Sequence, residues 1–324
     1  MIKRIALVQD APVAFDTARS LQMVERHCRA AARGKAELIL FPETFLPGYP
    51  AALDWPGEAG AFRADLGSQH YLTYWRGAVE QGDATDVALA AMAKEDAVQL
   101  HIGVVERVGK SLCNAVFSYN ADGSRMGVRR KVMPTHAERS VWVAADGSSL
   151  QVHDTDCGRV GVAICWENYM PLLRAALYAQ GVEIYLAPTA DDTEGWLASM
   201  RHIALEGRCF VLSACQFSRR SDYPDGYFRP DTFAPDHVMF SGGSCVIAPN
   251  GDVLAGPLRD GAGLLFADID LDQTVVGKHT LDVAGHYARP DIFTLHVDRR
   301  SRPLSGVSGV SGVSGVSDFN ADEA

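Results

Sequence analysis

The chain has 324 residues, of which 47% are hydrophobic, and a formal net charge of -10 at pH 7. This length suffices for one large or two ordinary domains, and the acidic balance argues against a nucleic-acid partner, which normally requires a basic excess. The seven scattered cysteines lack zinc spacing, and no apolar run forms a signal-peptide core or a membrane span, so we expect a cytoplasmic protein without metal that does not enter a membrane.

Predicted strands and helices alternate through the first half of the chain. An apolar strand at residues 5–8 precedes a helix with apolar residues at three- and four-residue spacing, which ends near Gly34. A strand at 37–41 stops at Pro42, and residues 44–69, with their glycines and prolines, are predicted to form a long loop. The next predicted elements are a helix capped by Asp83 and running to Asp96, a strand at 98–104, and a hairpin of strands 112–119 and 124–132.

The second half repeats this order. Its predicted elements are a hairpin of strands 151–153 and 159–165, helix 170–180, strand 184–187, helix 194–208, and strands 209–214, 244–248 and 264–269. Two runs of strands, each with its own helices, predict an α/β fold of two sheets packed face to face, a four-layer α-β-β-α sandwich. Residues 301–324 contain four Gly-Val-Ser triplets and are predicted to form a flexible low-complexity tail.

The segment most informative about chemistry is 161–171, where an apolar run stops at Cys165 and a helix begins near Pro171. This order predicts a strand-to-helix turn, and side chains at such turns face a cleft. Cys165 is therefore a candidate nucleophile. A buried thiol with only a packing role is the alternative, because that is the usual environment of a free cysteine.

Nucleophilic cysteine chemistry needs a base and a donor that stabilises developing negative charge. Glu43 follows a strand and a proline and lies between two phenylalanines, whose desolvation would raise the pKa of the carboxyl toward the range of a general base. Lys131 ends a predicted strand and can donate to an anionic intermediate, and Glu138 follows closely enough to reach the same cleft. The ordinary alternatives are a loop carboxylate, a solvated basic edge, and a surface ion pair of Glu138 with Arg139.

Three segments resemble, in the same order, the signatures of the nitrilase branch of the carbon-nitrogen hydrolase superfamily: residues 41–50, 130–139 and 165–171. Two further segments, 200–209 and 282–291, resemble the interface helix and the late segment of that family. The likeness extends from residue 1 to about 297. It implies the αββα fold of the superfamily and a domain over residues 1–300 that includes a C-terminal interface segment.

The resemblance implies that Glu43, Lys131 and Cys165 form a Glu-Lys-Cys triad with Glu138 as a supporting carboxylate. It further implies hydrolysis of an organic nitrile to a carboxylic acid and ammonia, through a thioimidate and a thioester on Cys165, with no cofactor. Asn168 favours nitrilases over cyanide-degrading branches, which often have His there. The alternatives are a cyanide dihydratase or amidase with the same triad and, from another class, a catalytically silent scaffold.

A substrate pocket is predicted from Tyr49, Trp142 and Trp166, together with Pro188 and Thr189, which the resemblance places near the substrate. The aromatic residues are also ordinary core residues, as are the further candidates Trp55 and Trp196. The helices 170–180 and 194–208 resemble the surfaces through which the family pairs its subunits, so we expect a homodimer or a longer spiral oligomer. The kind of nitrile stays open.

Overall fold

The computed structural model describes residues 1–51, 65–225, 227 and 233–302. Within these residues the strands form two sheets. The strand order in the first is β13 (Gly263–Asp270), β1 (Ile2–Gln9), β2 (Leu38–Leu40), β3 (Gln99–Val108), β4 (Ser111–Tyr119) and β5 (Arg125–Arg130). The order in the second is β10 (Phe217–Arg219), β11 (Val238–Ile247), β9 (Phe210–Ser213), β8 (Ile184–Leu186), β7 (Gly158–Val162) and β6 (Val152–Thr155), with β12 (Val253–Arg259) paired to β11.

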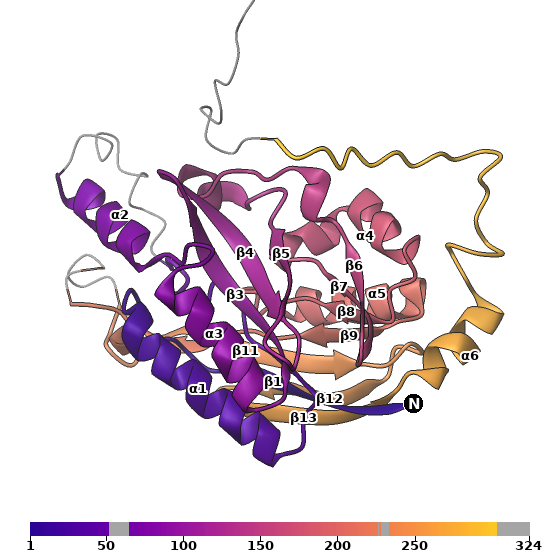
Figure 1. Cartoon of the computed structure of the whole chain (residues 1–324), viewed down its shortest axis with the longest axis horizontal. Helices are drawn as coiled ribbons and strands as arrows, with labels where there is room; N and C mark the ends of the chain where they lie inside the picture. The colour runs from indigo at the N-terminus through magenta and orange to yellow at the C-terminus, as the bar shows by residue number, and fades with distance from the viewer. Residues whose placement is uncertain (52–64, 226, 228–232, 303–324) are drawn as a thin grey trace, which may run out of the picture.

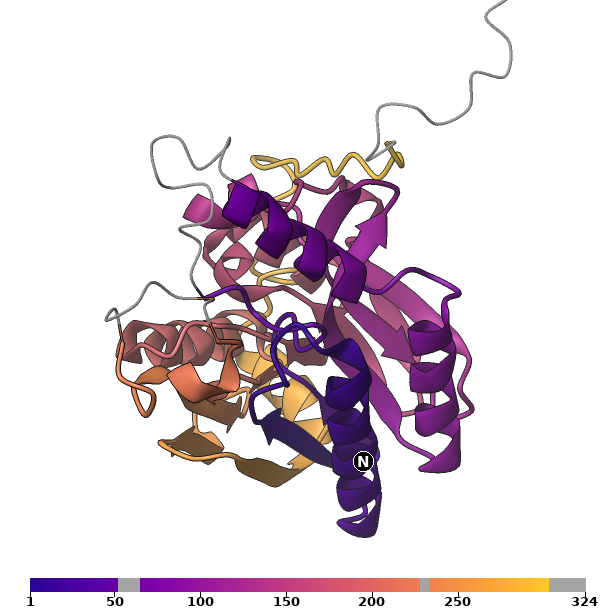
Figure 2. The same ribbon diagram turned by 90° about the vertical axis from the view of Figure 1, so that its left-hand side faces the viewer.

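The two sheets share one apolar core, as the alternation along β1 shows. Ile5 and Leu7 pack with strands of the second sheet, whereas Ala6 and Val8 pack on the opposite side, with helices α1 (Thr17–Arg33) and α3 (Ala84–Glu95). The helices are α1 (Thr17–Arg33) and α3 (Ala84–Glu95) on the first sheet, and α4 (Pro171–Tyr178) and α5 (Glu194–Gly207) on the second (Figures 1 and 2). These layers confirm the predicted α-β-β-α sandwich.

Side chains that accept hydrogen bonds from the backbone fix where the helices begin. The Asp83 carboxylate accepts from the N–H of Asp86, which confirms the predicted cap of α3. Asp16 and Thr193 do the same for α1 and α5. The other predicted boundaries differ from the observed ones mostly by one to four residues. Hydrogen-bond pairing fixes the ends of helices and strands, and the hydrophobic periodicity of the sequence does not show that pairing.

One prediction about the first half was wrong. The predicted loop 44–69 overlaps helix α2 (Asp65–Gly77), and its residues 52–64 lie outside the described residues. The helix is held by its aromatic residues, since Tyr74 is buried in a cluster with Val105 and Trp142. The glycines of this region led to the prediction of a loop, although the aromatic residues form the buried face of a helix.

The second half also differs in detail. Strand β13 does not join the second sheet but returns to the first, where it pairs antiparallel with the whole of β1. Strands β10 and β12 and helix α6 (Asp272–Thr280) were not predicted. The two runs of strands therefore do not each form a separate sheet, because β13, from the end of the chain, is an edge strand of the sheet that contains β1.

The segment after α6 runs along the outside of the molecule (Figure 1). It reaches the turn before β6, where the N–H of Arg302 donates to the Asp146 carboxylate at 2.5 Å. Most of the predicted tail, residues 303–324, lies outside the described residues. No helix in the described part of the chain is long and apolar enough to cross a membrane.

Candidate active site

Three of the predicted site residues lie just beyond strand ends. Glu43 follows β2, and Lys131 follows β5, whose pairing it continues by donating its N–H to the carbonyl of Asn114. Cys165 follows β7 and opens a short 3-10 helix, Cys165–Tyr169. Its φ of 50° is a left-handed conformation that is strained for a residue with a side chain, and such strain is typical of functional positions.

Lys131 links the two predicted carboxylates. Its Nζ donates to Glu43 Oε1 and to Glu138 Oε2, each at 2.7 Å, and all three side chains are buried. Glu138 also accepts from the hydroxyl of Tyr49 at 2.8 Å and from the N–H of Thr135 at 2.6 Å. Glu138 thus pairs inward with Lys131 rather than forming the alternative ion pair with Arg139 that the sequence left open.

The charges of this cluster shift the pKa values of its members. Burial pulls the pKa of Lys131 down, but the nearby carboxylates, Glu43 first, more than offset it and raise the pKa above its ordinary value. Burial raises the pKa of Glu43, and the ammonium of Lys131 partly opposes this rise. Burial, and then the charge of Glu43, raise the pKa of Cys165. At neutral pH the lysine is therefore charged and the thiol holds its proton.

The two oxygens of Glu43 have different environments. Oε1 accepts from Lys131 Nζ and from Asn114 Nδ2, the latter at 2.7 Å, whereas the buried Oε2 has no hydrogen-bond partner among the described residues. Oε2 therefore has lone pairs available to take a proton. Gln216 Nε2 donates to the Glu43 carbonyl at 2.7 Å and so fixes this loop. Asn114 and Gln216 were not predicted as site residues. The only signal for Asn114 was a polar side chain inside an apolar strand.

Two of the predicted pocket residues contact Cys165 itself. The hydroxyl of Thr189 donates to Cys165 Sγ at 3.2 Å, and the Cys165 N–H donates to the carbonyl of Pro188 at 2.9 Å. The Thr189 oxygen also accepts from the N–H of Asp191 at 2.9 Å. This acceptor role leaves the hydroxyl proton directed at the sulfur, where it stabilises a thiolate.

The predicted aromatic residues divide among the site, the surface and the core. Tyr49 and the buried Trp142 pack edge to face with ring centroids 5.8 Å apart, and Lys131 Nζ lies 6.0 Å from the Trp142 ring centroid. Trp166 is 50% exposed and donates from its indole to Asp191 at 2.8 Å. Trp196 is buried and donates to Ser213. Trp55 lies outside the described residues.

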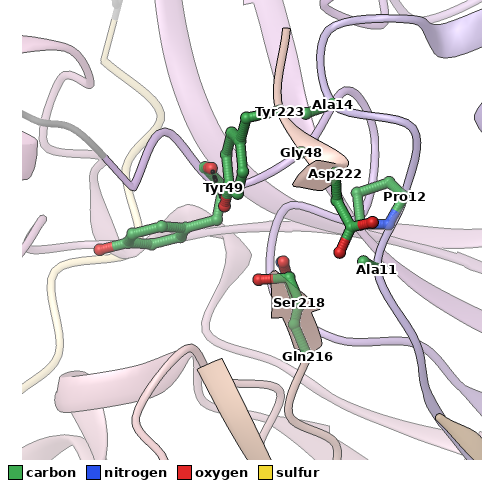
Figure 3. Close-up of a pocket in the computed structure, with 9 residues that line it drawn as sticks. All are labelled: Ala11, Pro12, Ala14, Gly48, Tyr49, Gln216, Ser218, Asp222 and Tyr223. Carbon is green, nitrogen blue, oxygen red and sulfur yellow. Dashed lines mark hydrogen bonds between the residues drawn. The ribbon is translucent and has the colours of Figure 1, made fainter. Parts of the chain in front are cut away.

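A small hollow lies beside the backbone of Tyr49 and is bordered by Gln216 and Tyr223. Figure 3 shows the ring of Tyr49 pointing away from the other residues of the hollow, which leaves its hydroxyl to bond Glu138. No group of three or more histidine, cysteine, aspartate or glutamate side chains placed to hold a metal occurs in the described part of the chain.

Comparison with known sequences identifies the family. The sequence pattern of the carbon-nitrogen hydrolases matches residues 4–277. The chain is 45% identical over 305 residues to an aliphatic nitrilase of Sinorhizobium fredii, covering 94% of this chain and 97% of that protein. It is 44% identical over 307 residues to a bifunctional nitrilase/nitrile hydratase of Nicotiana tabacum, covering 93% of this chain and 88% of that protein. The protein therefore belongs to the carbon-nitrogen hydrolase family.

Solved structures agree with this fold. The chain resembles the NitFhit protein of C. elegans with a TM-score of 0.72 and 20% identity, covering 94% of this chain and 69% of that one. It resembles a carbon-nitrogen hydrolase of Helicobacter pylori with a TM-score of 0.70 and 18% identity, covering 90% and 97%. At these identities the likeness concerns the fold alone.

Proposed function

We propose that the protein hydrolyses organic nitriles to carboxylic acids and ammonia, with Cys165 as nucleophile, Glu43 as general base and Lys131 as the donor to the anionic intermediates. The observation that carries this proposal is the buried contact of Lys131 with Glu43 and Glu138, three groups whose charges act on the pKa of the buried Cys165 thiol. Relatives named as nitrilases, similar over nearly the whole chain, support the nitrile as substrate.

The first half of the reaction forms a covalent intermediate. Cys165 Sγ attacks the nitrile carbon while its proton passes to Glu43 Oε2, and the carbon–nitrogen triple bond becomes a double bond. Lys131 stabilises the negative charge that develops on nitrogen. Glu43 then returns the proton to that nitrogen, and the product is a neutral thioimidate on Cys165.

The second half uses two waters. The first adds to the thioimidate carbon as Glu43 accepts its proton, and Lys131 stabilises the tetrahedral intermediate. Glu43 passes this proton to the nitrogen and then transfers the remaining hydroxyl proton to it as well, so that the carbon–nitrogen bond breaks, ammonia leaves with both protons of the water, and a thioester stays on Cys165. A second water cleaves the thioester, which releases the acid and restores the thiol. The mechanism needs no cofactor.

A substrate panel tests this function. Ammonia release is measured for an aliphatic nitrile, an arylaliphatic nitrile, benzonitrile, cyanide and the matching amides, with Cys165→Ala as control. We expect turnover of at least one organic nitrile to exceed that of its amide and of cyanide. Faster turnover of the amide would assign the protein as an amidase, and faster turnover of cyanide as a cyanide dihydratase. No turnover by a folded protein would favour the silent scaffold.

We also propose that the protein self-associates as a homodimer or a longer spiral through α4 and α5. The segment around the start of α4 exposes apolar side chains, among them Leu172, which is 70% exposed. Light scattering after size exclusion tests this, and Leu172→Asp should reduce the measured mass if α4 lies in the interface. A monomer in the unmodified protein would refute it. The cytoplasmic location stays a prediction.

A further inference from the structure

Glu167 lies two residues after the nucleophile and is buried. Its carboxylate accepts from Arg129 Nη2 at 2.9 and 3.0 Å, from the N–H of Val132 at 2.5 Å, and from the N–H of Ile164 at 2.9 Å. These donors belong to the two catalytic segments, because Arg129 and Val132 flank Lys131 and Ile164 immediately precedes Cys165. One carboxylate therefore holds both segments at once.

Arg129 joins the two sheets in the same way. It belongs to β5 of the first sheet, and its Nε donates to the carbonyl of Val162, the last residue of β7 in the second sheet, at 3.2 Å. Lys131 and Cys165 follow these same two strands. No strand pairing joins β5 to β7, so the distance between the ammonium and the sulfur depends on side chains that cross between the sheets.

We propose that Arg129 and Glu167 are a positioning pair that sets the separation of Lys131 from Cys165 across the two sheets. The inference rests on the proposed function, in which these two residues act together. Misplacement of a reacting group by about 1 Å can cost about 100-fold in rate. A planar guanidinium and a carboxylate with three donors fix both distance and orientation, which a single flexible contact would not.

The neighbouring pair Arg130 and Glu106 provides a matched control. Arg130 donates to Glu106 from Nε at 2.5 Å and from Nη2 at 2.7 Å, and the Glu106 side chain is as buried as that of Glu167. Both residues belong to the first sheet, on β5 and β3, so this ion pair does not reach the second sheet. Its loss should lower stability without changing the separation of the catalytic groups.

The experiment compares Arg129→Lys and Glu167→Asp with Arg130→Lys and Glu106→Asp. Each variant keeps its charge. Glu→Asp shortens the side chain by one methylene group, and Arg→Lys replaces the planar guanidinium with a single ammonium. We expect the first two variants to lower kcat for the best nitrile about 100-fold with KM within about threefold of the unmodified value. The control variants should lower Tm, by less for Arg130→Lys because its side chain is 26% exposed against 5% for Arg129, and keep kcat within about threefold.

A second readout does not depend on nitrile turnover. Alkylation of Cys165 by iodoacetamide, followed by mass spectrometry across pH, reports how well Lys131 stabilises the thiolate. Arg129→Lys and Glu167→Asp should slow this alkylation at neutral pH by about tenfold, which corresponds to a shift of about one pKa unit, while the control variants leave it unchanged. This arm tests the pair even if the protein hydrolyses no nitrile, which would refute the proposed function alone.

Two outcomes would overturn the inference. The first is a folded Arg129→Lys or Glu167→Asp whose kcat and alkylation rate stay within threefold of the unmodified protein. The second is an equal loss of both in the control variants, which would make the effect a general consequence of lost stability. If one variant of the pair does not fold, its partner variant decides.

Discussion

Replacing Lys131 with methionine tests its contribution to stability beside its proposed contribution to catalysis, because the substitution removes the ammonium that contacts both buried carboxylates. Lys131 Nζ lies 2.7 Å from Glu43 and 2.7 Å from Glu138 in a site with almost no solvent exposure. Removing one partner of a buried ion pair costs about 3–5 kcal/mol, a large share of the roughly 5–15 kcal/mol by which a domain is stable. We expect Lys131→Met to lose this amount at pH 8.

The sign of the pH dependence follows from the carboxylates. Burial already raises the pKa of Glu43, and loss of Lys131 raises it further. A carboxyl whose pKa is higher in the folded than in the unfolded protein contributes stability that is present at low pH and is lost as pH rises through the folded pKa. The deficit of Lys131→Met relative to the unmodified protein should therefore be small near pH 5 and largest at pH 8.

Urea unfolding at the two pH values measures this deficit, and ammonia release measures catalysis. The double variant Lys131→Met with Glu138→Gln should recover part of the stability, because one unpaired carboxylate is gone. It should stay at least about 100-fold less active than the unmodified protein, since the proposed donor to the anionic intermediates is still missing. Equal deficits at both pH values with no recovery in the double variant, or ammonia release within threefold of the unmodified rate, would refute this reasoning.

Three further predictions concern the other site residues. Cys165→Ala should keep the fold and abolish ammonia release, and mass spectrometry during turnover should detect an adduct on the unmodified protein only. The acid limb of kcat/KM should have its midpoint above 4.5, the ordinary value for a glutamate, because burial raises the pKa of Glu43; a midpoint at or below 4.5 would remove Glu43 as base. Thr189→Val should slow alkylation of Cys165 by roughly tenfold through loss of a hydrogen bond to the thiolate, and an unchanged rate would show that the hydroxyl does not act on the sulfur.

The positions of Glu43 and Cys165 could be predicted because each follows an apolar strand. Strand β5 before Lys131 contains three arginines, so Lys131 was recognised only as the end of a predicted hairpin strand. Their mutual placement could not be derived from local patterns, since it depends on how two sheets face each other. Asn114 illustrates the limit. It lies in the middle of β4 and donates a hydrogen bond to Glu43, which is 71 residues earlier in the chain. Only the position of β4 in the sheet brings the two residues together.

The fold shows the same division between local and distant determinants. The helix begun after Asp83 was predicted from its cap and periodicity, both of which are local. The pairing of β13 with β1 was not predicted, because it joins residues about 260 positions apart and because the alternation of either strand fits either sheet. The layers and most elements were therefore predicted, whereas α2, α6, β10 and β12 were missed and the order of strands within the sheets was not predicted.

The chemistry itself explains why a site this acidic can be buried. If Glu43 and Glu138 are both ionised, Lys131 neutralises only one of them, and a free thiolate beside them would add another negative charge in a region of low dielectric. Transfer of the Cys165 proton to Glu43 avoids this, because the negative charge moves from carboxylate to sulfur without increasing. In the proposed mechanism, attack on the nitrile then moves that charge to nitrogen, where Lys131 stabilises it. The raised pKa of Lys131 keeps it charged, which suits the proposed division of roles, with Lys131 stabilising the anions and Glu43 transferring protons.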